Sequence, residues 1–350
     1  MRPSRICAGL SPLVTAAGWT ALCRLALVLA VAIGAALAQR GTPVGAAGGE
    51  TGALRQARLY GIASSKTFSN VNRDDARAAL KVWFNIVARQ RGFVLDTRMD
   101  IVDGVAEIRE RLQNHSADLV MLGVPDYLEL ESSRLLVPVL THARNAQGGG
   151  LYSYVLVARN SSAATSIAGL RGKNILAFSR NGVNTGIAWI DVLLGKEKLG
   201  RAASFFASIK VPAKAQACVL PVFFGTADAC VVDEVNLDLA KEMNPQLGQL
   251  KVLARSRPMV ESVIATPAEE GPYRKDLIDS ILSLHEDARG RQLLMVFKTE
   301  RVVRLQPGDL DSARELWREY YRLPGASPLR PPGPTAAAES SPPERGKERY

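Results

Sequence analysis

The stretch LRGKNILAFSRNGVNTGIAWIDVLL, residues 170–194, decides how the chain is interpreted. Its largely apolar residues 174–178 predict a buried strand, and the polar, glycine-containing residues 179–183 predict a turn. Asn184 is a residue type that caps helices, because its side-chain oxygen accepts a hydrogen bond from a free backbone N–H one turn on. Apolar residues then recur at helical spacing, so the stretch predicts a strand, a turn and a helix that begins near Thr185.

This strand–turn–helix arrangement favours an anion at the start of the helix. The first N–H groups of a helix have no partner within it, and the helix dipole places partial positive charge there. Gly186 has no side chain to obstruct a ligand, and Thr185 adds a hydroxyl. The alternative is that this is one of the many capped helices that follow strands in α/β domains and bind nothing.

Length and composition narrow the class of protein. The chain has 350 residues, of which 47% are hydrophobic, and this is enough for two ordinary domains. Its net charge of +10 comes from 44 basic residues interspersed among 34 acidic ones. Because the basic residues form no block, and because zinc-finger spacing and stacking motifs are absent, we expect no nucleic-acid partner.

The N-terminus has the features of a secretory signal peptide. Three arginines precede the apolar run LALVLAVAIGAALA at residues 25–38, which ends in the small-x-small pattern Ala36-Leu37-Ala38. The run is short for a membrane span, so we predict a signal peptide over residues 1–38, followed by a flexible leader at 39–54. The alternative is that the segment is retained as an anchor. We therefore expect a periplasmic protein.

The cysteines fit export. Cys7 and Cys23 lie within the predicted signal peptide, which leaves Cys218 and Cys230 in an oxidising compartment. These two form either a disulfide or two buried thiols. Neither has a nearby histidine, so the sequence predicts no metal site and no cofactor.

The order of predicted elements indicates two α/β lobes. Residues 55–150 begin with a β-α-β-α-β pattern, typical of a parallel sheet flanked by helices. Two long strands follow, at 135–141 and 152–158, and they suit either crossings between the lobes or an antiparallel edge. Residues 151–249 form the second lobe by the same pattern. Residues 250–323 are expected to return to the first lobe, and the proline-rich tail at 324–350 is expected to be disordered.

The common catalytic motifs are absent, since the chain contains no GxSxG, GxxxxGK[ST], HExxH or GxGxxG pattern. We therefore predict that the protein is not an enzyme. Asp233 follows the predicted strand at 229–232, and α/β sheets bind ligands at the carboxyl ends of their strands. Asp233 is a candidate ligand-binding residue for that reason, with a helix N-cap as the alternative.

Four stretches together resemble the phosphate/phosphite/phosphonate-binding family of periplasmic proteins that serve ABC importers. They are VNRDDARAALKVW at 71–83, ADLVMLG at 117–123, LRGKNILAF at 170–178 with its NTG turn, and FFGTADACVVDEVNLDLA at 223–240. The resemblance runs from about Arg58 to Arg322. It implies the type II periplasmic-binding-protein fold, in which two lobes, each a mostly parallel sheet with flanking helices, close on a ligand.

The resemblance also implies ligand-binding residues. The family's hydroxyl-rich turn before the second-lobe helix corresponds to Val183-Asn184-Thr185-Gly186, where only Thr185 keeps a hydroxyl. The hydroxyl residues that end the first strand correspond to Ser64 and Ser65. An acidic position that holds a ligand amine corresponds to the neutral Gln216, so an aminoalkyl phosphonate is not expected. Tyr127 takes the place of an aromatic residue that the family has nearer the strand, and Asp103 is a further candidate in the first lobe.

The resulting expectation is a monomeric solute-binding protein that captures a small oxyanion by hinge closure and delivers it to an ABC permease in the inner membrane. Two alternatives stay open: a periplasmic sensor that signals to a membrane kinase, and an exported enzyme on a related two-lobe fold.

Overall fold

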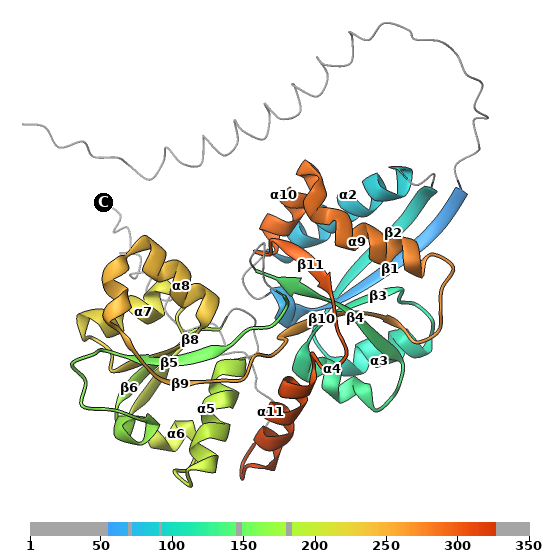
Figure 1. The fold of residues 1–350 in the computed structure, drawn as a ribbon. Coiled ribbons are helices and arrows are strands. Elements are labelled where there is room, and N and C mark those ends of the chain that lie inside the picture. Colours follow the sequence, from blue (N-terminus) through green and yellow to red (C-terminus); the bar gives the residue numbers. More distant parts are fainter. Residues whose placement is uncertain (1–54, 69–71, 91–92, 145–148, 180–183, 327–350) are drawn as a thin grey trace, which may run out of the picture. The chain divides into compact units, whose positions relative to one another are not determined.

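The structure is a computed structural model that describes residues 55–68, 72–90, 93–144, 149–179 and 184–326 (Figure 1). All of these belong to one compact unit, Leu54–Tyr350. The predicted signal peptide, the leader, Val183 and the tail from residue 327 lie outside the described residues.

The first of two sheets has six strands in the order β11-β4-β10-β3-β1-β2. Strand β1 pairs in parallel with β2 and β3, whereas β10 and β11 join antiparallel. The strands are β1 (Arg55–Ser64), β2 (Phe93–Val102), β3 (Leu119–Gly123), β4 (Leu136–Ala143), β10 (Ser262–Pro267) and β11 (Arg301–Arg304).

Helices cover both faces of this sheet (Figure 1). One apolar core lies under α2 (Arg73–Gln90), α9 (Arg274–Leu282), η4 (Ser283–Glu286) and α10 (Ala288–Val296). The other lies under α3 (Val105–Gln113) and α4 (Val124–Glu131), and the short η1 (Ser65–Phe68) follows β1. Helix α2 begins where Asn72 accepts hydrogen bonds from the N–H groups of Asp74 and Asp75, as expected for an N-cap.

The second sheet has five strands in the order β7-β6-β8-β5-β9. They are β5 (Tyr154–Ala158), β6 (Asn174–Ala177), β7 (Ser208–Lys210), β8 (Ala229–Asp233) and β9 (Lys251–Arg255). Its helical elements are η2 (Ile167–Leu170), α5 (Thr185–Lys196), α6 (Ala202–Phe205), α7 (Gln216–Phe224), α8 (Glu234–Met243) and η3 (Pro245–Gln249). Helices α7 and α8 cover one face, and α5 and α6 cover the other.

The predicted two-lobe α/β organisation is confirmed, with two differences. Each sheet is mixed rather than mostly parallel, because the chain crosses from β4 to β5 and returns from β9 to β10, and these strands pair antiparallel with their neighbours. The predicted return to the first lobe at residue 250 is wrong. Strand β9 pairs with β5 in the second sheet, so the return follows Arg255.

The last helix, α11 (Asp311–Arg322), packs against α5 and also against α4. Its buried face includes Trp317 and Tyr320. Arg314 donates two hydrogen bonds to Glu131 of α4, at 3.0 and 2.7 Å, and Lys196 of α5 lies 2.8 Å from Glu319. Helix α11 therefore contacts a helix from each lobe instead of belonging to the first lobe alone.

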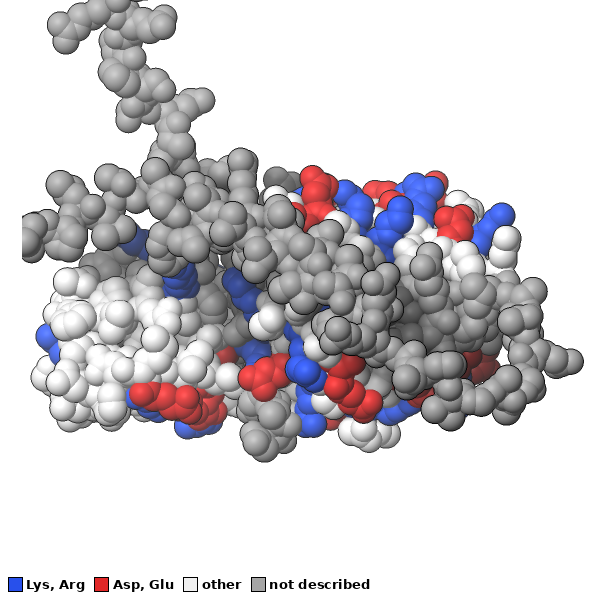
Figure 2. Space-filling model, turned by 90° about the horizontal axis from the view of Figure 1, so that it is seen from above, with Lys and Arg blue, Asp and Glu red and all other residues white. Residues whose placement is uncertain are grey.

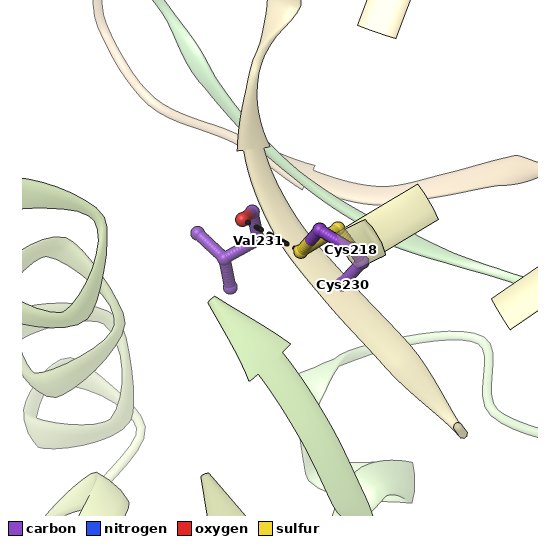
Figure 3. The surroundings of a disulfide bond; sticks show 3 residues. All are labelled: Cys218, Cys230 and Val231. Atoms are coloured by element: carbon purple, nitrogen blue, oxygen red, sulfur yellow. Dashed lines mark hydrogen bonds between the residues drawn. A yellow bond between two sulfur atoms is a disulfide. The ribbon is translucent and has the colours of Figure 1, made fainter. Parts of the chain in front are cut away.

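Cys218 and Cys230 form a disulfide that joins α7 to β8 (Figure 3). Their Cα atoms are 5.7 Å apart, and both residues are fully buried in the core under α7 and α8. Cys218 Sγ lies 3.4 Å from the carbonyl oxygen of Val231. The sequence left the state of this pair open, and the structure has it bonded.

Charge is unevenly distributed over the face of the molecule seen in Figure 2. Basic and acidic residues are interspersed over part of this face, and the described surface at the left of the view is largely uncharged. Helix α7 itself contains no charged residue. Within the described residues, no helix combines the length and apolarity needed to cross a membrane.

Candidate functional site

The N-terminus of α5 begins at the residue that the sequence indicated. Asn184 Oδ1 accepts a hydrogen bond from the Ile187 N–H at 3.0 Å, so the predicted N-cap is confirmed. The other end of this side chain is unusual, because Asn184 Nδ2 is buried and has no hydrogen-bond partner among the described residues. Thr185 is 5% exposed. The first turn of α5 thus combines helical N–H groups with a buried amide donor that has no acceptor in the described part of the chain.

Gly186 brings this first turn close to the neighbouring strands. A Cβ atom at Gly186 would lie 3.0 Å from Val231 and 3.1 Å from the ring of Tyr154. Glycine therefore allows α5 to approach β8 and the start of β5 closely, since a larger residue would need these side chains to shift. The contact also places the ring of Tyr154 directly beside the helix N-terminus.

Tyr154 belongs to a group of buried ionisable side chains, here called the Arg144 cluster, which consists of Arg144, Tyr154, Asp233 and Glu261. Arg144 follows β4, Glu261 precedes β10, and Tyr154 and Asp233 are partners in the pairing of β5 with β8. Arg144 Nη2 and the Tyr154 hydroxyl both donate to Glu261. Arg144 Nη1 lies 3.1 Å from Asp233 Oδ1, so this ion pair links a residue of the first crossing to a strand of the second sheet.

Charge pairing explains how the Arg144 cluster tolerates burial. Burial by itself would lower the pKa of Arg144, but Glu261 and Asp233 outweigh it and raise that pKa above its usual value, so the guanidinium stays charged. Burial, followed by Glu261, raises the pKa of Tyr154 well above 10, so its hydroxyl stays neutral. His142, two residues before Arg144, has a pKa lowered to about 4 by burial and by the Arg144 charge. The guanidinium also lies over the ring of Tyr152, 3.9 Å from its centroid.

Asp233 forms the helix N-cap that the sequence offered as the alternative to a ligand-binding role. Its Oδ1 accepts a hydrogen bond from the Asn236 N–H at 3.1 Å and so caps α8. The same carboxylate, 2% exposed, is the ion-pair partner of Arg144. A cap alone does not require a buried cation, so the second contact is the one that connects Asp233 to the candidate site.

In the first lobe, Ser64 ends β1 with its hydroxyl already engaged. Ser64 Oγ donates to Asp126 Oδ2 at 2.9 Å, and Lys66 Nζ donates to Asp126 Oδ1 at 2.7 Å. Asp126 is 4% exposed and lies in the first turn of α4. Ser65 starts η1 next to this group. The carboxyl end of β1 thus carries a Ser64–Lys66–Asp126 network.

Three other candidates have different partners. Asp103 is exposed and pairs with Arg73 at 3.3 Å. Tyr127 is buried with its hydroxyl 3.3 Å from Glu131, one turn along α4, and burial together with Glu131 raises its pKa to about 12. Gln216 is exposed and lies 3.7 Å from Sδ of Met243, the last residue of α8.

The position of Gln216 follows from the length of α8. This helix starts immediately after Asp233 and has 10 residues, so its last residue lies about 15 Å from the Arg144 cluster. Asn184, Thr185, Gly186 and Asp233 thus lie at one edge of the second sheet, with Tyr154 next to both Gly186 and Asp233, and Gln216 lies away from them.

The sequence reasoning missed Arg144, Tyr154 and Glu261. Each lies next to or at the end of a strand, where the chain passes from one sheet to the other. The available signal was the place of these residues next to largely apolar strands. A charged residue that is buried there usually has a partner. The partner, however, is 117 residues away in the chain, which local patterns do not reveal.

The model of a protein family described as "ABC transporter, phosphonate, periplasmic substrate-binding protein" matches residues 67–310. The chain belongs to this family. The resemblance read from the sequence is therefore confirmed, and with it the expectation of a transport binding protein rather than an enzyme. A sequence comparison with curated proteins finds no match.

Solved structures support the phosphonate-family fold. A protein of Xanthomonas citri solved with bound ATP is 17% identical with a TM-score of 0.53, over 76% of this chain and 97% of that one. PhnD1 of Prochlorococcus marinus, in complex with methylphosphonate, is 15% identical with a TM-score of 0.51, over 76% of this chain and 99% of that one. The predicted periplasmic-binding-protein fold is confirmed.

Proposed function

We propose that this phosphonate-family protein is the periplasmic solute-binding component of an ABC importer, and that it captures a small oxyanion such as phosphate, phosphite or a phosphonate by hinge closure. It would act as a monomer after export and deliver its ligand to a permease in the inner membrane. Family membership supports the transport role and the ligand class.

One observation carries the assignment of the site to the N-terminus of α5. Asn184 uses Oδ1 to cap the helix, and its Nδ2 is a buried donor without an acceptor in the described part of the chain. A buried donor left unpaired costs about 1–3 kcal/mol, so such groups usually have a function. An oxyanion at this position would accept from Nδ2 and from the first N–H groups of the helix and would meet the positive end of the dipole.

The test is a titration of phosphate, phosphite, methylphosphonate and methanesulfonate against the protein purified from the periplasm of an expression host. Binding is followed by thermal unfolding and by calorimetry. A ligand present at 100 times its dissociation constant should raise the free energy of unfolding by about 2.7 kcal/mol.

The variant Asn184→Asp sharpens this test. Aspartate still caps the helix, but a negative charge replaces the amide donor, so the cap survives while anion binding is lost. Asn244→Asp is the matched control, because Asn244 caps η3 by a similar hydrogen bond, to the Gln246 N–H at 3.2 Å. If no anion stabilises the protein, or if Asn184→Asp binds as well as the control, the proposed site is wrong.

A further inference from the structure

Arg144 has a hydrogen-bond donor that is not used. Its side chain is 7% exposed, and Nη2 donates to Glu261. Nη1 lies at ion-pair distance from Asp233 but makes no hydrogen bond within the described residues. An ion pair balances charge without satisfying the directional demand of an N–H group. The charge of Arg144 is therefore paired with two carboxylates, while Nη1 can still donate to an acceptor that the described residues do not supply.

The unused donor lies at the same edge of the second sheet as the N-terminus of α5. Asp233, the neighbour of Nη1, is the last residue of β8. Strand β6 runs parallel to β8 and leads towards α5. Tyr154, which pairs with Asp233 across the strands, has its ring against Gly186. Arg144 Nη1 and Asn184 Nδ2, two buried donors for which residues 55–326, apart from the undescribed gaps, offer no acceptor, thus lie at one carboxyl edge.

The charges at this edge limit how much negative charge a ligand can carry. Arg144 contributes one positive charge, and Asp233 and Glu261 contribute two negative ones, so the cluster carries a net charge of about −1. The other groups around Arg144 are His142, which is neutral above about pH 4, the neutral Tyr154, and Tyr152 below the guanidinium. The N-termini of α5 and α8, about +0.5 each, offset this excess but leave no positive charge over for the second charge of a dianion.

We propose that Arg144 is a specificity-determining residue which donates Nη1 to the bound oxyanion, and that its carboxylate partners Asp233 and Glu261 restrict the ligand to a singly charged oxyanion. This inference rests on the proposed function and names the charge state that the same site selects. A doubly charged anion would face a cluster whose single cation is already neutralised, whereas a monoanion meets half the repulsion and still satisfies both donors.

The test is the dissociation constant of methylphosphonate between pH 6 and pH 9, measured by calorimetry. Methylphosphonate loses its second proton within this range. If only the monoanion binds, the dissociation constant rises tenfold per pH unit above that pKa. Asp233→Asn keeps an N-cap acceptor for α8 and removes one negative charge, so we expect it to flatten this rise. Arg144→Lys keeps the charge and loses the Nη1 geometry, so we expect binding at least tenfold weaker at pH 6.

The outcomes separate this inference from the proposed function. If the wild-type protein binds methylphosphonate equally well at pH 6 and pH 9, or if Asp233→Asn leaves the pH dependence unchanged, the charge selection is wrong while anion binding stands. If a folded Arg144→Lys protein, checked by circular dichroism and thermal unfolding, binds as tightly as wild type, Arg144 is not a ligand contact. If no anion binds the wild-type protein at any pH, the proposed function itself fails.

Discussion

Reduction of the Cys218–Cys230 disulfide should destabilise the protein by an amount that its loop length sets. The cysteines are 12 residues apart, and closing a loop of this size removes about 10 cal/mol/K of entropy from the unfolded chain, or about 3 kcal/mol at 25 °C. The folded state should lose little more, because the reduced Cys218 thiol is placed to donate to the Val231 carbonyl oxygen, 3.4 Å away. The bond therefore acts mainly on the unfolded state.

The assay is equilibrium unfolding in urea with and without a thiol-free reductant such as a phosphine. Samples must equilibrate through the unfolding transition, because both cysteines are fully buried and the native bond is shielded. The double variant Cys218→Ala/Cys230→Ala is the control, since its unfolding curve should not respond to reductant. A change in the free energy of unfolding below about 1 kcal/mol would refute the loop-entropy reasoning.

Three further predictions follow from single contacts. Gly186→Ala should weaken anion binding and lower the free energy of unfolding by about 1–3 kcal/mol, because its Cβ would meet neighbours at 3.0–3.2 Å. Gly248→Ala is the control, because a Cβ there has no atom within 4 Å, and it should change neither binding in calorimetry nor unfolding in urea. The His142 pKa, lowered to about 4 from 6.5, means that the unfolded state binds more protons between these values, so stability should fall as the pH drops from 6.5 to 4 by up to about 1.4 kcal/mol per unit. Urea midpoints of His142→Gln should depend less on pH in this window, and an equal dependence contradicts the assignment. Glu131→Gln weakens the acceptor of the two Arg314 hydrogen bonds and should lower the free energy of unfolding by about 1 kcal/mol. An unchanged free energy of unfolding would show that this partly exposed pair does not stabilise the protein.

Local features of the chain, and the fold class that their order indicates, were predictable from the sequence. The strand at Asn174–Ala177 and the cap at Asn184 each depend on residues close together in the chain, so the pattern and the structure agree on both. The order of strands and helices was likewise sufficient to indicate two lobes. Strand β9 was assigned to the wrong sheet because its sequence shows only that it is a strand, not which neighbour it pairs with.

The interactions that connect distant parts of the chain were not predictable in this way. Arg144 and Glu261 meet only because the chain crosses between the sheets twice, and neither residue has a local partner that reveals its burial. Gln216 illustrates the opposite error. A position carried over from a family pattern depends on how a helix is set against its sheet, and here that side chain lies at the far end of α8.

The packing of α11 places two tryptophans where their fluorescence can report on domain motion. Trp189 on α5 and Trp317 on α11 are both buried, and Trp189 lines a cavity of about 220 Å³ together with Leu316 of α11. Because α11 also contacts α4, any rotation of one lobe against the other alters the surroundings of these indoles (Figure 1). Changes in intrinsic fluorescence should therefore track domain motion in the unlabelled protein on the timescale of stopped-flow mixing.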